Sequence, residues 1–122
     1  MFVCVVCGGR AFGGRALVWS ALDRVLRERG SSGFVLWHGG CPSGADALAA
    51  AWAVSRGVPV RVWPAEWSRF GRAAGPLRSA AMCSAAAASG CRCGLVAFPG
   101  GRGSAACVAA ARAAGLGVWC PR

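Results

Sequence analysis

The sequence predicts an α/β fold over residues 1–122: one domain, built as a three-layer sandwich of about five parallel strands with helices on both faces. The length suits one ordinary domain and leaves no room for a second. Apolar residues make up 56% of the chain and charged residues only 15%, so the chain can bury a sizeable core. Short apolar runs alternate with longer amphipathic or alanine-rich stretches, as they do when helices connect parallel strands.

The apolar runs are expected to form the strands, because each is short and continuous. They cover residues 2–7, 34–37, 58–63, 94–98 and 117–120. Continuous apolar strands separated by helices imply a parallel sheet that is covered on both faces, since right-handed crossovers place helices there. The economical arrangement of such a chain is a doubly wound sheet.

The stretches between these runs are expected to form helices, at residues 16–29, 45–56, 76–88 and 104–114. In the first of them, Val18 and Leu22 fall on one helical face, and Gly30 supplies a C-terminal stop. The stretch 64–75 is rich in glycine and proline, so it is expected to be an ordered loop. Pro76, directly after it, suits the first turn of a helix.

The chain carries no signal for a membrane or for export. Gly, Arg or Ser interrupts every apolar run before it reaches the roughly 18 residues that cross a bilayer. The first ten residues lack the basic segment of a secretory signal peptide. We therefore expect a cytoplasmic protein without a membrane partner.

The charge is strongly positive, with 14 basic residues against 4 acidic ones and a net charge of +10. Every basic residue is arginine, and the chain has no Lys, Asn, Gln, Ile, Thr or Tyr, which is typical of GC-rich codon usage. The arginines are scattered along the chain and form no basic run. Non-specific attraction to polyanions is expected, whereas a nucleic-acid function is possible but not favoured.

The eight cysteines are expected to be small buried thiols in a reducing compartment. Cys4 and Cys7 have the spacing of a zinc or redox motif, but a strand would point their side chains to opposite faces. We therefore expect no metal site and no obligatory disulfide.

Three glycine-rich turns follow strands, at residues 7–10, 38–46 and 98–104. In a parallel sheet these turns emerge at the carboxyl edge, where such folds place their ligands. Glycine lets backbone N–H groups approach an anion, and each following helix points its positive end at the same place. Arg10, Arg78 and Arg102 can add charge-assisted hydrogen bonds. The pattern predicts a phosphate site, although it matches neither the G-x-G-x-x-G fingerprint nor a lysine-containing phosphate loop.

The predicted ligand-binding residues are these turns together with a few neighbouring polar and aromatic side chains. They are Gly8, Gly9, Arg10, His38, Gly39, Gly40, Ser43, Gly44, Asp46, Trp67, Arg78, Pro99, Gly100, Gly101, Arg102, Gly103 and Ser104. For three of them an alternative stays open. Asp46 either caps its helix or contacts a ribose hydroxyl, His38 is either structural or an acid–base group, and Trp67 either stacks on a base or packs under its loop.

Several blocks of the chain, taken in order, resemble the YspA-related branch of the SLOG superfamily. The blocks are Cys7–Arg10, His38–Gly40 with Gly44–Asp46, Pro64–Trp67, Gly71–Met82 and Ala97–Ser104. Members are Rossmann-like domains, common as small forms in bacteria and phages, and are related to the LOG phosphoribohydrolases and to the DNA-processing protein DprA. The resemblance implies a nucleotide-derived ligand, and no cofactor is expected. Alanine-rich helices such as 76–88 allow close approach, and many LOG relatives are dimers, so we expect a homodimer through helical faces.

The chain also departs from the family's pattern. Asn is usual where Ser79 stands, Thr where Ser104 stands, and Asp where Ala11 and Glu66 stand. The LOG motif ends in a glutamate that is linked to cleavage of an N-glycosidic bond, and here that position is Cys107. The leading expectation is therefore a binder or sensor of a phosphate-containing nucleotide. LOG-like hydrolysis, with Glu66 and Arg78 as weak catalytic candidates, and DprA-like binding of single-stranded DNA are the alternatives.

Overall fold

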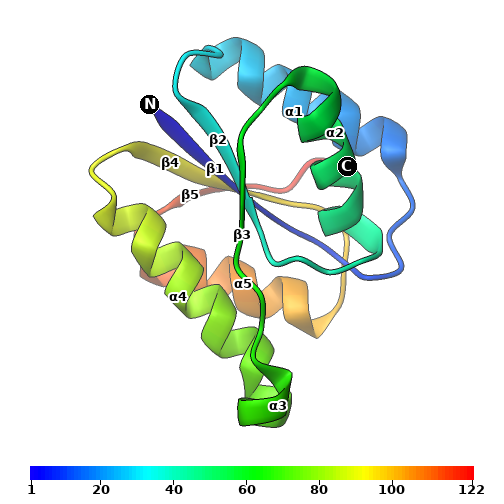
Figure 1. Ribbon diagram of the computed structural model, residues 1–122, viewed down its shortest axis with the longest axis vertical. Coiled ribbons are helices and arrows are strands. Elements are labelled where there is room, and N and C mark those ends of the chain that lie inside the picture. Colours follow the sequence, from blue (N-terminus) through cyan, green and yellow to red (C-terminus); the bar gives the residue numbers. More distant parts are fainter.

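The computed structural model describes residues 1–122 and contains one five-stranded sheet in which every neighbouring pair of strands is parallel. The strand order is β3-β2-β1-β4-β5 (Figure 1). The strands are β1 (Phe2–Cys7), β2 (Phe34–His38), β3 (Val60–Val62), β4 (Arg92–Ala97) and β5 (Gly117–Trp119). The predicted parallel α/β sheet is thus confirmed, with strand bounds that differ by a few residues.

The helices form one layer on each side of the sheet, as Figure 1 shows. They are α1 (Arg15–Arg29), α2 (Gly44–Arg56), the short α3 (Trp67–Phe70), α4 (Ala74–Ala88) and α5 (Arg102–Ala113). Helices α1 and α2 contribute buried side chains to one core cluster, and α4 and α5 contribute theirs to a second cluster on the opposite face. The arrangement is the expected three-layer, Rossmann-like sandwich.

Strand β1 lies at the centre of the sheet and is buried along its whole length. Side chains alternate between the two faces of a strand. Cys4 accordingly packs in the cluster with α1 and α2, whereas Cys7 packs in the cluster with α4 and α5. The prediction that these two thiols face opposite ways is confirmed.

Two segments differ from the predictions. The stretch 64–75 was expected to be a loop, but it contains α3 and a 3₁₀ turn (Gly71–Ala73) that leads directly into α4. Strand β3 was expected to be a buried run from 58 to 63, but it spans three residues, all exposed, at the edge of the sheet. An edge strand pairs with only one neighbour, so an apolar sequence there is not proof of burial.

The cysteines divide into two groups. Cys4, Cys7, Cys83 and Cys107 are buried, as expected, whereas Cys41, Cys91 and Cys93 are half-buried and Cys120 is exposed. The expectation of a wholly buried set was therefore wrong for the thiols in the loops, at the start of β4 and near the C-terminus.

The connections reverse direction at the middle of the sheet. From β1 the chain runs outward through β2 to β3, then crosses back to β4, which pairs with β1 on its other side. The carboxyl ends of β1 and β4 thus flank a topological switch point, where open α/β sheets bind their ligands.

No helix of the structure has both the length and the apolar character needed to cross a membrane.

Candidate functional site

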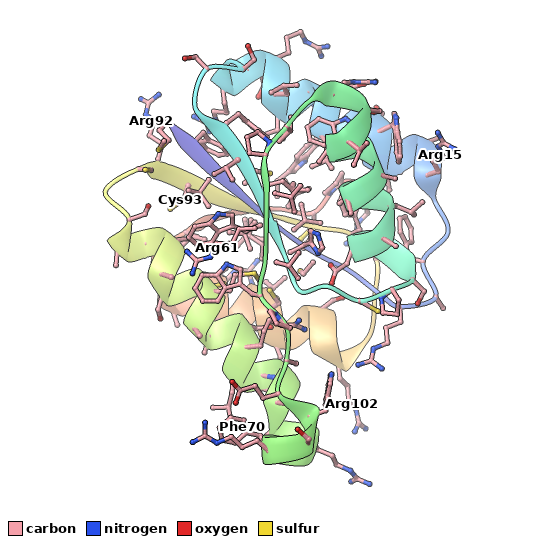
Figure 2. All side chains as sticks on the ribbon, in the orientation of Figure 1. Arg15, Arg61, Phe70, Arg92, Cys93 and Arg102 are labelled. Atoms are coloured by element: carbon pink, nitrogen blue, oxygen red, sulfur yellow. The ribbon has the colours of Figure 1, made fainter.

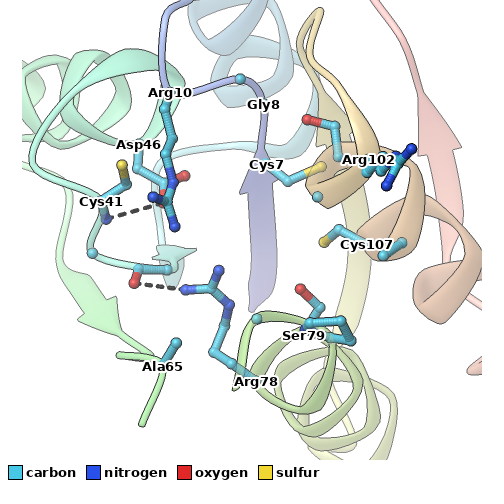
Figure 3. A pocket seen from close by; sticks show the side chains of 18 of the residues that line it. Cys7, Gly8, Arg10, Cys41, Asp46, Ala65, Arg78, Ser79, Arg102 and Cys107 are labelled. Carbon is cyan, nitrogen blue, oxygen red and sulfur yellow. Dashed lines mark hydrogen bonds between the residues drawn. The ribbon is translucent and has the colours of Figure 1, made fainter. Parts of the chain in front are cut away.

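A cavity of about 810 Å³ opens at the switch point, between the strand-to-helix turns and the start of α4. Most of the predicted ligand-binding residues line it, and Figure 3 shows several of them. The predicted residues that line it are Gly8, Gly9, Arg10, Gly39, Gly40, Ser43, Asp46, Trp67, Arg78, Gly101, Arg102, Gly103 and Ser104. The structure thus gathers side chains from every part of the chain at one edge of the sheet.

The remaining predicted residues do not line the cavity. They are His38, Gly44, Pro99, Gly100 and the catalytic candidate Glu66. Glu66 directly precedes α3, is exposed and pairs with Arg69, with 3.5 Å between its Oε2 and the Arg69 Nη1. Asp46 is therefore the one carboxylate among the lining residues.

The glycines of the three turns have two different roles. The Gly9 N–H donates to the Pro99 carbonyl at 3.0 Å, and the Ala45 N–H donates to the Gly9 carbonyl at 3.2 Å. A Cβ added at Gly100 would overlap Ser104 Oγ and the Gly9 backbone, whereas one added at Gly101 would meet nothing within 4 Å. The turns pack backbone to backbone at Gly9 and Gly100, and only Gly101 and Gly103 face open space.

The amino-terminal end of α5 is the strongest anion-binding feature. The helix begins at Arg102 behind Gly101, and no side chain caps it. The Ser104 hydroxyl is buried, belongs to the cavity lining and has no hydrogen-bond partner. Since unpaired N–H groups and the helix dipole favour negative charge there, this end of α5 offers an unfilled set of donors.

Arg78 connects α4 to the ends of two strands. Its Nη1 donates to the Gly39 carbonyl at 2.7 Å and to the Trp63 carbonyl at 3.2 Å, while its Nε is buried without a partner. The Nη1 group of Arg78 therefore holds the turn after β2. The same guanidinium lines the cavity and contributes its positive charge there (Figure 3).

His38, at the end of β2, and Asp46, in the first turn of α2, flank the turn after β2. The Cys41 N–H donates to Asp46 Oδ2 at 3.2 Å, and the Gly40 N–H donates to His38 Nδ1 at 2.9 Å. Burial raises the pKa of Asp46, although the Cys41 N–H and the charges of His38 and Arg78 oppose this. Burial lowers the pKa of His38, Arg78 lowers it further, and Asp46 opposes both. His38 is 5% exposed, does not line the cavity, and uses its Nδ1 to accept the Gly40 N–H.

Trp67 stands at the mouth of the cavity with 48% of its surface exposed. Of the two alternatives for Trp67, packing of the whole ring under the loop does not agree with this exposure. The Arg10 guanidinium carbon lies 5.2 Å from the ring centroid, and a Cβ at Gly75 would meet the ring at 3.4 Å. The ring is thus held in place while part of it stays accessible.

Sequence reasoning missed several lining residues, above all Cys7 and Cys107. Both were interpreted as core thiols, and both are in fact at least 92% buried, with exposed fractions of 8% and 2%. The helical spacing of Ser104, Cys107 and Ala111 could have placed Cys107 beside Ser104, because the three residues share one buried face of α5. Arg72 was also missed, and it adds a further positive charge at the cavity.

The lining is strongly cationic. Arg10, Arg72, Arg78 and Arg102 are balanced by Asp46 alone. Clefts lined by one sign of charge concentrate ligands of the opposite sign, so the cavity is suited to an anion.

Comparison with known proteins identifies the family. A search of curated proteins finds no match. The family model for the YspA, cpYpsA-related SLOG family matches residues 2–70, which run from β1 to α3 and include the first two glycine-rich turns. The Pro99–Ser104 turn lies beyond the matched residues, and its place beside the other two turns comes from the structure. With a match over more than half its residues, the chain belongs to the YspA, cpYpsA-related SLOG family.

Proposed function

We propose that this protein binds a nucleotide-related small molecule that contains phosphate, at the cavity on the carboxyl edge of its sheet. The observation that carries the proposal is the end of α5, where the buried Ser104 hydroxyl and the uncapped N–H groups have no partner. Unpaired buried donors are costly, and a phosphate accepts several hydrogen bonds at once. Family membership is compatible with such a ligand.

The proposed position of the ligand follows from the chemistry of the lining. Phosphate oxygens are placed against the N–H groups of Gly101 to Ser104, with Arg102 supplying a charge-assisted hydrogen bond. Trp67 offers a partly exposed aromatic surface for stacking on a base. Asp46 already accepts one backbone hydrogen bond and has a second oxygen for a ribose hydroxyl.

Binding without turnover fits these residues better than LOG-like hydrolysis. Oxocarbenium stabilisation or water activation needs a carboxylate at the reacting carbon. Cys107 stands at the position of the LOG glutamate, and Glu66 pairs with Arg69 outside the cavity. We therefore expect no hydrolysis of purine nucleoside monophosphates above background, and sustained release of free base would refute this part of the proposal.

The decisive experiment is calorimetric titration with AMP, GMP, ADP and inorganic phosphate. Gly101→Val should abolish nucleotide binding while leaving the far-ultraviolet circular dichroism unchanged, because the added side chain meets only open space in the free protein. Arg102→Ala should weaken binding by about 1.5 to 3 kcal/mol, roughly ten- to a hundredfold. Ser104→Ala tests the unpartnered hydroxyl, and Arg122→Ala is the control that should change nothing.

Two outcomes would contradict the proposal. One is unchanged nucleotide affinity in a folded Gly101→Val protein, which would place the ligand elsewhere. The other is the absence of binding for every phosphorylated compound tested. If affinity instead rose with the length of a single-stranded oligonucleotide and fell steeply with salt, the DprA-like alternative would replace it.

A further inference from the structure

Three buried thiols meet beneath the cavity, on the face of the sheet that α4 and α5 cover. Cys7 is the last residue of β1, Cys83 lies in α4 and Cys107 lies in α5. All three belong to the same core cluster, and their exposed fractions are 8%, 0% and 2%. Each comes from a different element, so the cluster exists only in the folded chain.

Two of these thiols reach the cavity. Cys7 and Cys107 belong to its lining, whereas Cys83 does not. Figure 3 shows the side chains of Cys7 and Cys107 in the same part of the cavity as Arg102. The side chains of Cys7, Cys83 and Cys107 pack in one core cluster. The cavity therefore gives a small solute access to this pair.

The pKa values of the three thiols shift in different directions. Hydrogen bonds from Cys7 and Cys83 lower the pKa of Cys107, and Ser79 and the charge of Arg78 act in the same direction, while burial opposes them. The hydrogen bond to Cys107, burial and neighbouring charges raise the pKa of Cys7. A thiolate beside a protonated thiol is the usual arrangement of a redox-sensitive cysteine and its resolving partner.

We propose that Cys107 is a site of oxidation by a small peroxide and that Cys7 resolves it as an intramolecular disulfide. The Cys107 thiolate attacks one oxygen of hydrogen peroxide, the O–O bond breaks, and the released hydroxide takes a proton to leave as water. The product is a sulfenic acid. The Cys7 sulfur then attacks the Cys107 sulfur, the S–O bond breaks, and the departing hydroxide takes the Cys7 proton as a second water. Overall two thiols lose two electrons and two protons, and the peroxide is reduced to two waters.

This inference goes beyond the proposed function and does not depend on it. A Cys7–Cys107 disulfide would tie the end of β1 to α5 with an S–S bond of roughly 2 Å. Cys107 is buried in α5 about one helical turn after Ser104, so that bond would lie close to the end of α5 that carries Ser104. Oxidation would thereby link two elements that line the cavity, β1 and α5, whatever ligand the cavity holds.

The test uses the purified, reduced wild-type protein without added nucleotide. One equivalent of hydrogen peroxide is added, free thiols are blocked, and the unreduced protein is digested with trypsin. Cleavage after arginine places Cys107 as the only cysteine in peptide 103–112, Cys7 in peptide 1–10, and Cys83 in peptide 79–92. The expected result is a linked pair of peptides 1–10 and 103–112 that disappears on reduction.

Matched variants distinguish the cysteines. Cys4 shares a peptide with Cys7 but faces α1 and α2, so Cys4→Ala should keep the cross-link and Cys7→Ala should lose it. In Cys7→Ala, a reagent specific for sulfenic acids should label peptide 103–112. Cys107→Ala should abolish both the cross-link and that label. No linked pair in the wild-type protein, a pair between 79–92 and 103–112 instead, or a cross-link that survives Cys7→Ala would each overturn the proposal.

Discussion

At the scale of single residues, His38 shows how burial selects a protonation state. It is the only histidine of the chain, it is 5% exposed, and its Nδ1 accepts the Gly40 N–H. A protonated ring would lose this acceptor and would place a positive charge in the interior beside Arg78. His38 therefore helps to shape the turn after β2 in its neutral form.

This geometry predicts a pH-dependent stability. Because the pKa of His38 is lowered in the folded protein, the unfolded chain binds more protons near pH 6.5. The free energy of unfolding should therefore fall as the pH is lowered from 7.5 to 5.5, by at most about 1.4 kcal/mol per pH unit. Urea unfolding at several pH values measures it.

The matched variant is His38→Asn, whose side-chain oxygen can replace Nδ1 as an acceptor but does not titrate. The variant should lose this part of the pH dependence while remaining folded. An identical slope in both proteins would show that His38 is not its source.

At the scale of elements, the turns after β1 and β4 pack so closely that two neighbouring glycines should respond differently to substitution. Gly100→Ala should destabilise the fold by about 1 to 3 kcal/mol, because its Cβ would overlap Ser104 Oγ and the Gly9 backbone. Gly101→Ala should change the stability little, since its Cβ meets nothing within 4 Å. Chemical denaturation of both variants is the measurement, and equal losses would contradict the described packing.

At the scale of the whole molecule, the positive charge is spread over the surface. The labelled Arg15, Arg61, Arg92 and Arg102 lie on separate parts of the molecule in Figure 2. Several arginines stack on aromatic rings, as Arg61 does on Trp63 with 4.1 Å from its guanidinium carbon to the ring centroid. Such dispersed charge favours weak, salt-sensitive attraction to polyanions over a defined nucleic-acid interface.

Assembly is the second question at this scale, and we predict a homodimer through the outer face of α4. This helix exposes Leu77 at 49% together with alanines such as Ala80 and Ala81, which allow close approach. Light scattering at micromolar concentration should give twice the mass of one chain, and Leu77→Glu should reduce it to one chain. Val54→Glu, on an exposed position of α2, is the control and should leave the dimer intact. A wild-type mass of one chain would refute the prediction.

Features that depend on neighbouring residues could be predicted from the amino-acid sequence. Apolar runs and glycine stops predicted β1, α1 and α2, and Gly30 and Gly57 end their helices with φ of +84° and +67°. Glycine turns after parallel strands predicted the edge of the sheet at which the cavity lies. The elements and the sheet edge both follow from local backbone preferences and from the alternation of side chains along a strand. Both of these can be recognised in the sequence itself.

The side chains that meet at that edge could not be predicted from the sequence. Arg78 hydrogen-bonds to a carbonyl 39 positions earlier, Glu66 turns away toward Arg69, and Cys7 meets Cys107 from an element at the other end of the chain. The exposure of β3 likewise follows from its place at the sheet edge and not from its apolar sequence. Such contacts depend on how the helices pack over the sheet, and no local pattern of residues records that packing.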